Sequence, residues 1–197
     1  MKSKIYIKFK SIVDYTVSFI ALLLLSPIML LIAIIIKIDS RGPVFFKQKR
    51  VCKNKNHFMI YKYRTMRTDT PKDMPTHMLN NPDAYITKIG KFLRKSSLDE
   101  LPQLINIVKG EMSIIGPRPA LWNQYDLLEE RDKYNANDIK PGLTGLAQIN
   151  GRDELPIEIK AKYDGDYVRQ ISLLLDMKIF ALTIFKVFNS EGVKEGK

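Results

Sequence analysis

The sequence contains a single cysteine, Cys52, and only two histidines, His57 and His77, which lie far apart along the chain. One thiol excludes a disulfide framework, and one thiol with two separated imidazoles excludes zinc sites built from four cysteines or from paired cysteines and histidines. Any metal must therefore be held by carboxylates and by the phosphates of a substrate. Such oxygen ligands point to magnesium rather than zinc.

Acidic residues are scarce relative to basic ones, with 21 Asp and Glu against 32 Lys and Arg among 197 residues, so the formal net charge is +11. This excess implies an anionic partner, which is nucleic acid, acidic lipid or a phosphorylated substrate. The chain has no Walker motif, no GxGxxG fingerprint and no aromatic-basic nucleic-acid module. Its length allows one globular domain and an anchor.

A long apolar segment from Ile12 to Ile36 is interrupted by one charge, Asp14. It is longer than the ~20 residues that span a bilayer core, and it lacks the cleavage site of a signal peptide. Lysines and arginines flank it on both sides, so the positive-inside rule places both flanks in the cytoplasm. That distribution favours a re-entrant hairpin over a straight span.

A break suited to such a hairpin occurs at Ser26-Pro27, near the middle of the segment. Pro27 lacks an N–H and kinks a helix, and the Ser26 hydroxyl can bond a carbonyl that loses its partner. Proline is also common in ordinary transmembrane helices. Charge and break alone therefore leave the re-entrant and the spanning arrangement open.

The remaining sequence predicts an α+β fold that is mostly helical. Aromatic and β-branched residues predict a small strand pair at 43–50 and 57–65, joined by the basic loop 52–56. Turn-forming residues predict loops at 68–83 and 140–152. Apolar residues at helical spacing predict helices at 86–93, 98–108, 122–133, 157–168 and 171–188. The last of these could lie in the membrane interface or pack in the core.

The adjacent carboxylates Asp99 and Glu100 are the first candidates for chemistry. Near a helix start they would project in different directions, which suits two roles better than one chelate. The alternative is structural, because Ser97 would then be an N-cap with Glu100 as its capping-box partner.

Nearby residues favour a function. Arg118 stands between two prolines, which fix the backbone and present its guanidinium to phosphate. Arg94 precedes the carboxylate pair closely, and the glycines after Pro141 would let backbone N–H groups approach an anion. These residues together suggest phosphoryl chemistry next to lipid.

Several motifs occur in one order along nearly the whole chain, to about residue 190. They are Lys62-Tyr63-Arg64-Thr65-Met66, Ser97-Leu98-Asp99-Glu100-Leu101-Pro102-Gln103, Lys109-Gly110-Glu111-Met112-Ser113 running into Gly116-Pro117-Arg118-Pro119, Pro141-Gly142-Leu143-Thr144-Gly145 with Gln148 and Gly151-Arg152, and Asp164-Gly165-Asp166-Tyr167 with Asp176. In combination they closely resemble the bacterial sugar transferase family, the monotopic polyprenyl-phosphate phosphoglycosyl transferases.

The resemblance implies an enzyme that converts a UDP-sugar and undecaprenyl phosphate into undecaprenyl-diphosphate-sugar and UMP, the first membrane step of capsule, O-antigen or glycoprotein glycan synthesis. Asp99 would be the nucleophile and would touch magnesium, and Glu100 would assist the second step. Arg94 and Arg118 would hold phosphate oxygens. Lys62, Gln148 and Asp164 would contact substrate or loops.

The resemblance also implies a re-entrant anchor broken at Ser26 and Pro27. We therefore expect a membrane anchor at residues 1–40 and a catalytic domain with interfacial helices at 41–197, on the cytoplasmic face of the bacterial inner membrane. The chain looks like the minimal catalytic form, without additional amino-terminal spans. The expected partners are a UDP-sugar, undecaprenyl phosphate and membrane lipid, but not nucleic acid.

The sequence leaves the sugar open. The segment Ser190-Glu191-Gly192-Val193 resembles family members that use N-acetylated deoxy-amino sugars. It also leaves open whether the chain forms a homodimer. Two rival functions are a membrane-surface protein without enzymatic activity, and a related enzyme in which Asp99 only binds metal and no covalent intermediate forms.

Overall fold

A computed structural model describes residues 2–71, 82–151 and 155–188 of the chain. The predicted fold class is confirmed at the level of a mostly helical α+β protein with two small sheets. The elements in chain order are α1 (Lys2–Asp39), β1 (Phe45–Val51), η1 (Lys53–Lys55), β2 (His57–Tyr63), η3 (Pro82–Ala84), α2 (Lys88–Lys95), η4 (Leu98–Glu100), α3 (Gln103–Val108), β3 (Ser113–Ile115), α4 (Tyr125–Asp132), η5 (Ala136–Asp138), β4 (Gly142–Thr144), α5 (Leu146–Ile149), α6 (Ile157–Gln170) and α7 (Leu173–Phe188).

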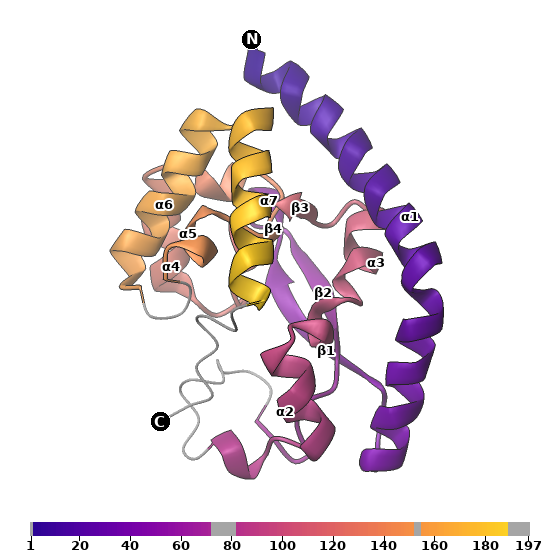
Figure 1. Ribbon diagram of the computed structural model, residues 1–197. Helices are drawn as coiled ribbons and strands as arrows, with labels where there is room; N and C mark the ends of the chain where they lie inside the picture. The colour runs from indigo at the N-terminus through magenta and orange to yellow at the C-terminus, as the bar shows by residue number, and fades with distance from the viewer. Residues whose placement is uncertain (1, 72–81, 152–154, 189–197) are drawn as a thin grey trace.

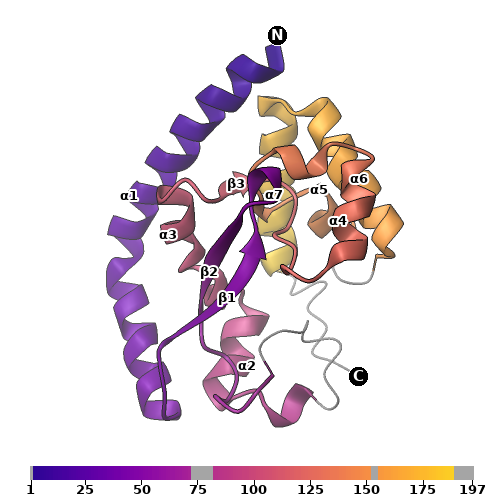
Figure 2. The ribbon, with the colours of Figure 1, turned by 180° about the vertical axis from the view of Figure 1, so that it is seen from behind.

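The long helix α1 runs along one side of the domain and bows around it, as Figures 1 and 2 show. It is continuous through Pro27, so the structure does not confirm a helix hairpin. The Ser26 hydroxyl donates a hydrogen bond of 2.8 Å to the carbonyl of Leu23. That carbonyl lies four residues before Pro27 and would otherwise have no donor in the helix. The expected role of Ser26 is therefore confirmed without the expected reversal of the chain.

One stripe of α1 faces the rest of the protein from Lys10 to Ile36. Its buried residues follow helical spacing, starting with Lys10, Asp14 and Ser18 and ending with Ile32 and Ile36. The apolar end packs with Tyr63 and Leu93, and the Tyr63 hydroxyl donates to the Met29 carbonyl at 2.8 Å. The opposite face of α1 exposes large apolar side chains from Ile5 to Ile38.

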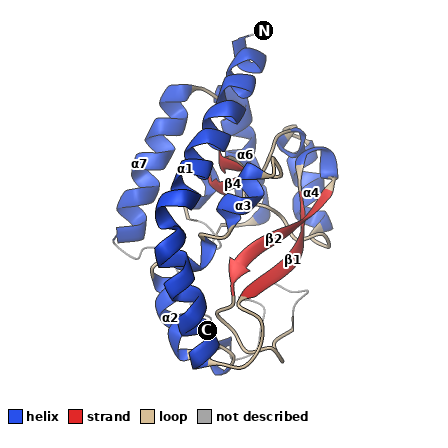
Figure 3. Cartoon of the chain, turned by 90° about the vertical axis from the view of Figure 1, so that its right-hand side faces the viewer, coloured by secondary structure: helices blue, strands red, loops and turns tan. Residues whose placement is uncertain are grey.

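The predicted strand pair is confirmed as the antiparallel hairpin of β1 and β2, in which Phe45 pairs with Tyr63 and Val51 with His57. Helix α3 packs on β2 through Leu104 and Ile107, which contact Phe58 and Ile60. Figure 3 shows the hairpin between α1 and α7 on one side and α4 on the other.

The predicted loop 140–152 is only partly a loop. Its residues 142–144 form β4, which pairs in parallel with β3, and its residues 146–149 form α5. The reason is a close backbone approach. A Cβ on Gly142 would lie 2.1 Å from the Gly116 nitrogen, and a Cβ on Gly145 would lie 2.1 Å from the Gly116 oxygen. Only residues without side chains allow two chain segments to pass this closely.

The helices near the carboxyl end lie close to their predicted positions. α6 covers the predicted range 157–168, while α4 begins three residues after the predicted start at 122. α7 is amphipathic: Ile179 on its inner face is fully buried, whereas Leu174 and Phe185 on its outer face are more than half exposed. Of the predicted loop 68–83, residues 72–81 lie outside the described residues.

Candidate functional site

The carboxylate pair lies in η4, a single 3-10 turn between α2 and α3. Ser97 precedes this turn with a left-handed φ of 56°, and its side chain makes no capping hydrogen bond. Only its carbonyl takes part, accepting from the Glu100 N–H at 3.2 Å. The predicted Ser97 cap and its capping box are therefore wrong, and the Glu100 side chain points into an ion cluster instead.

The ion cluster joins three separate parts of the chain. One oxygen of Glu100 accepts from Lys62 Nζ at 2.7 Å and from Arg118 Nη2 at 3.3 Å. Lys62 comes from β2, Glu100 from η4, and Arg118 from the turn after β3. The structure thus brings together three of the residues singled out in the sequence, and their side chains are 12 to 26% exposed.

Asp99 completes this cluster. Burial lowers the pKa of the Lys62 ammonium, and Arg118 lowers it further, while the charges of Glu100 and Asp99 oppose the shift. Asp99 is half-buried, whereas Glu100 is buried. The two neighbouring carboxylates therefore differ in environment: Glu100 is enclosed between two cations, and Asp99 lies nearer the surface beside them. This arrangement suits a phosphate-bearing ligand that approaches Asp99.

Two other arginines donate hydrogen bonds to backbone carbonyls of the turn that presents Arg118. Arg131 donates from Nη2 to the Arg118 carbonyl at 2.9 Å, and Arg50 donates to the Pro119 carbonyl at 2.9 Å. Arg131 in turn forms a buried ion pair with Asp164, at 2.6 Å from Nη2 and 2.8 Å from Nε. Asp164 is 1% exposed. The structure therefore places Asp164 behind the turn, buried against Arg131, and its contact with a substrate stays a prediction.

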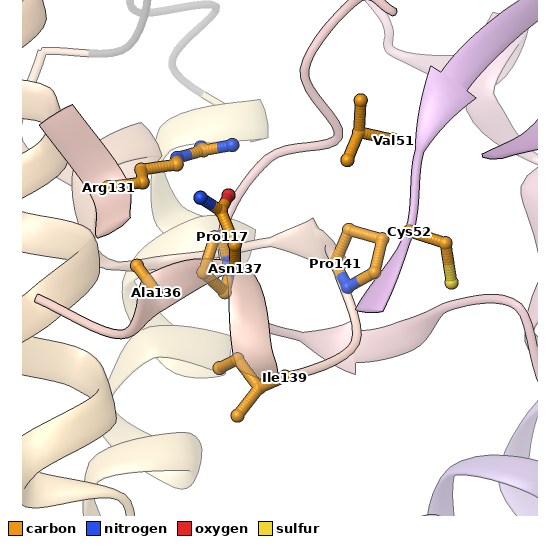
Figure 4. Close-up of a pocket in the computed structure, with 8 residues that line it drawn as sticks. All are labelled: Val51, Cys52, Pro117, Arg131, Ala136, Asn137, Ile139 and Pro141. Carbon is orange, nitrogen blue, oxygen red and sulfur yellow. The ribbon is translucent and has the colours of Figure 1, made fainter. Parts of the chain in front are cut away.

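Figure 4 shows Arg131 at the edge of a small cavity between α4 and the hairpin, together with Asn137, Pro117 and Pro141. Asn137 donates to the Leu128 carbonyl and to Asp132. These contacts connect η5 and α4 with the proline turn, residues 116–119, and together they support Arg118.

The other predicted contacts come from the β4–α5 segment and from α2. Gln148 donates to the Leu143 carbonyl at 2.9 Å, within the β4–α5 segment. Arg94 lies in the last turn of α2, shortly before η4, and stays a predicted phosphate contact. Arg152 lies outside the described residues.

A buried polar cluster that sequence reasoning did not predict connects α1 with α7. Lys10 Nζ lies 2.9 Å from Asp176 and 3.4 Å from Asp14. Asp14 accepts from the Ser113 hydroxyl at 2.5 Å, and Asp176 accepts from the Tyr167 hydroxyl at 2.8 Å. Lys10 and Asp14 stand one helical turn apart at the start of an apolar segment, and this spacing was the available signal.

Among the described residues, no group of three or more His, Cys, Asp and Glu side chains could hold a metal ion. The cluster itself offers two carboxylates, and one of them is already paired with two cations. A metal at this site would need oxygen ligands from substrate phosphates to complete its coordination. Such a donor set fits magnesium.

The family model for bacterial sugar transferases matches residues 5–190 of the chain. The chain is 40% identical to the uncharacterized sugar transferase EpsL of Bacillus subtilis, over 94% of this chain and 90% of that protein. It is 43% identical to the UDP-glucose:undecaprenyl-phosphate glucose-1-phosphate transferase of Klebsiella pneumoniae, over 91% of this chain and 40% of that protein.

A third relative is the UDP-N-acetylgalactosamine-undecaprenyl-phosphate N-acetylgalactosaminephosphotransferase of Aeromonas hydrophila, which is 35% identical over 98% of this chain and 47% of that protein. The chain therefore spans less than half the length of these last two relatives. The family match covers almost all of the sequence, including the carboxylate pair, the proline turn and α7. The chain belongs to the bacterial sugar transferase family.

Proposed function

We propose that this chain transfers a sugar-1-phosphate from a UDP-sugar to undecaprenyl phosphate and releases UMP. The observation that carries the proposal is the ion cluster, in which Lys62 and Arg118 converge on Glu100, the neighbour of Asp99, from two other parts of the chain. Two relatives are named for transfer of this kind to undecaprenyl phosphate. The cluster supplies what such a transfer needs, which is a nucleophile next to cations that can bind phosphate oxygens.

In the first step, a carboxylate oxygen of Asp99 attacks the β-phosphorus of the UDP-sugar. A new phosphorus–oxygen bond forms to Asp99 while the bond from that phosphorus to the bridging oxygen breaks, and UMP leaves with the bridging oxygen. The product is a sugar phosphate joined to the Asp99 carboxylate as an acyl phosphate. Arg118 and Lys62 lie where they can balance the charge that moves onto the leaving phosphate.

In the second step, a phosphate oxygen of undecaprenyl phosphate attacks the same phosphorus, and the bond to Asp99 breaks. This yields undecaprenyl-diphosphate-sugar and restores the carboxylate. If the lipid phosphate arrives with a proton, Glu100 is the neighbouring group that can accept it. Its ion pairs with Lys62 and Arg118 hold it in position for this role.

Magnesium fits the donor set of this site through Asp99 and the two phosphates of the nucleotide. When bound, it would neutralise phosphate charge as UMP leaves.

The packing of α1 supports a membrane anchor that enters and leaves on the same side. The helix is about 57 Å long at 1.5 Å per residue, well beyond the ~30 Å hydrocarbon core, and one part of it is long and apolar enough to cross a membrane. Yet contacts with the same domain run from Lys10 at one end to Ile36 at the other. A domain on one side of a bilayer cannot contact both ends of a straight span.

We therefore place α1 in one leaflet at the cytoplasmic face, with its exposed apolar face toward the lipid. The outer face of α7 exposes apolar side chains that suit the same interface, including Leu174, Met177 and Phe185. The carboxylate pair lies next to this anchor, because Leu98 and Leu101 on either side of the pair pack against the apolar end of α1. In this placement, residues 1–40 form the anchor and residues 41–197 form the catalytic domain.

We propose a UDP-sugar as the donor and do not choose the sugar. The two relatives named for substrates act on UDP-glucose and UDP-N-acetylgalactosamine, so their names do not select one donor. Transfer of the first sugar phosphate to the lipid carrier would start a surface polysaccharide or another glycan.

The test is UMP release from a panel of UDP-sugars by purified, folded protein in lipid nanodiscs with undecaprenyl phosphate and magnesium. We expect release with at least one donor, dependent on the lipid phosphate for continued turnover. Lys47→Gln serves as a matched control, because Lys47 is a cation on the same hairpin that lies over the Tyr61 ring and outside the ion cluster. Lys62→Met should lose activity while Lys47→Gln retains it. Absence of UMP with every donor would favour a membrane-surface protein without enzymatic activity.

A further inference from the structure

A second hollow lies between the hairpin and the first turns of α4. It encloses about 480 Å³, which is within the range of small-molecule sites. Its walls combine two groups that can bind anions, Lys49 and His57, with the rings of Trp122 and Tyr125 and the Glu129 carboxylate. Lys55 also lines the hollow, but its ammonium pairs with Asp132 at 2.5 Å.

The strand register separates this hollow from the catalytic cluster. Lys49 and His57 lie on one face of the hairpin, because Lys49 pairs with Met59 and His57 with Val51. Lys62 pairs with Phe46, and residues of even number in both strands project to the opposite face. A ligand in the hollow would therefore not contact the Lys62–Glu100 pair.

The aromatic residues in the hollow are accessible. Tyr125 is 63% exposed, and Lys49 Nζ lies 5.3 Å from the centre of the Trp122 ring. A flat ring could stack on Tyr125 or Trp122, with stacking free energies of about 1–3 kcal/mol per base in known nucleotide sites. Lys49 and His57 stand close enough to these rings to donate to a phosphate, and the Glu129 carboxylate can accept from sugar hydroxyls.

The position of the hollow favours a water-soluble ligand over a lipid. In Figure 3, α4 lies across the hairpin from α1 and α7, whose exposed apolar faces suit the membrane. A lipid headgroup at the bilayer surface would therefore meet the opposite side of the domain.

We propose that this hollow binds a nucleoside phosphate, with the base stacked on the aromatic rings and the phosphate held by Lys49 and His57. The site is separate from the catalytic cluster, so binding there does not depend on the proposed transfer reaction. A nucleotide stacked on Trp122 could influence the turn that presents Arg118, because Trp122 follows Arg118 by only four residues.

The chain offers a direct probe, because Trp122 is its single tryptophan. We would titrate the full-length protein in nanodiscs with UMP, with uridine and with inorganic phosphate, and follow Trp122 fluorescence. Saturable quenching by UMP is expected, with much weaker responses to uridine and phosphate alone. Isothermal titration calorimetry on the same samples gives the affinity independently of the fluorophore.

Two variants make the result specific. Lys49→Gln should weaken UMP binding by about tenfold, while Lys47→Gln should leave it unchanged, because Lys47 lies on the same strand over Tyr61 and outside the hollow. Arg118→Gln should also retain the quenching, since the Arg118 guanidinium pairs with Glu100 and does not line the hollow. The proposal is overturned by an absence of saturable quenching, by an equal loss in both lysine variants, by loss in Arg118→Gln, or by inorganic phosphate binding as well as UMP.

Discussion

Replacing Asp164 with asparagine would leave the guanidinium of Arg131 buried beside a neutral amide. The two side chains are 4% and 1% exposed, and Asp164 accepts from both Nε and Nη2 of Arg131. Removing one partner of such a buried pair costs about 3–5 kcal/mol, since the remaining charge keeps its desolvation penalty. For a protein of this size, we expect the melting temperature to fall by roughly 6–20 °C, at about 2–4 °C per kcal/mol.

The assay is thermal unfolding of Asp164→Asn in nanodiscs beside the double variant Asp164→Leu with Arg131→Met. The double variant removes both charges, and it should recover much of the lost stability because apolar pairs of similar volume often replace buried ion pairs without loss. Both variants should have reduced activity even when folded, because Arg131 no longer holds the Arg118 carbonyl correctly. A melting temperature for Asp164→Asn within about 2 °C of the parent would refute this reasoning.

Three further predictions concern the cluster, the glycines and the anchor. Because burial lowers the pKa of Lys62 and its charged form pairs with Glu100, kcat/KM should fall as pH rises through that lowered pKa; in Lys62→Arg, any remaining activity should lose this alkaline fall, and an unchanged pH profile would contradict the role of the Lys62 charge. Gly142→Ala should destabilise the fold by about 3 kcal/mol in a denaturant titration, since its Cβ would meet the backbone of Gly116 at 2.1 Å. Gly110→Ala, which meets only Lys140 Nζ at 3.7 Å, should cost about 1 kcal/mol through its positive φ; equal losses would be evidence against the close approach. Tags at both termini should be protected from a membrane-impermeant reagent in intact cells, and labelling of the amino-terminal tag from outside would contradict the placement of α1.

Local patterns were sufficient to predict the elements that depend on local interactions. The hairpin of β1 and β2 and the helix α6 follow from alternation and helical spacing within a few residues. The α5 helix and the β4 strand could not be predicted in this way, because β4 exists only where Gly142 meets Gly116, which lies far away in sequence. Glycines that permit a close tertiary contact look the same in sequence as glycines in a loop.

The residues of the candidate site were also predicted only in part. Asp99, Glu100, Lys62 and Arg118 were singled out from the sequence, and the structure brings Lys62, Glu100 and Arg118 into contact. The proposed cap at Ser97 failed because that residue adopts a left-handed conformation, which a sequence pattern does not reveal.

The residues that support the site were harder to find. Arg131 was not selected, since an arginine in an amphipathic helix is usually solvated, and only the fold shows that it faces Asp164. The cluster of Lys10, Asp14 and Asp176 likewise joins opposite ends of the chain. Its signals in the sequence were a pair of charges on one face of α1 next to an otherwise apolar segment, and the motif that contains Tyr167 and Asp176.

The central claim is the covalent role of Asp99, and mass spectrometry of the intact protein tests it most directly. The protein is incubated with its UDP-sugar and magnesium without undecaprenyl phosphate, then digested to locate any modification. We predict one sugar-phosphate adduct on Asp99, formed together with one equivalent of UMP and lost when the lipid phosphate is added. Asp99→Asn should form no adduct, and its turnover should be negligible. Full turnover by Asp99→Asn, or UMP release by the parent only when both substrates are present, would contradict the covalent mechanism and favour direct transfer.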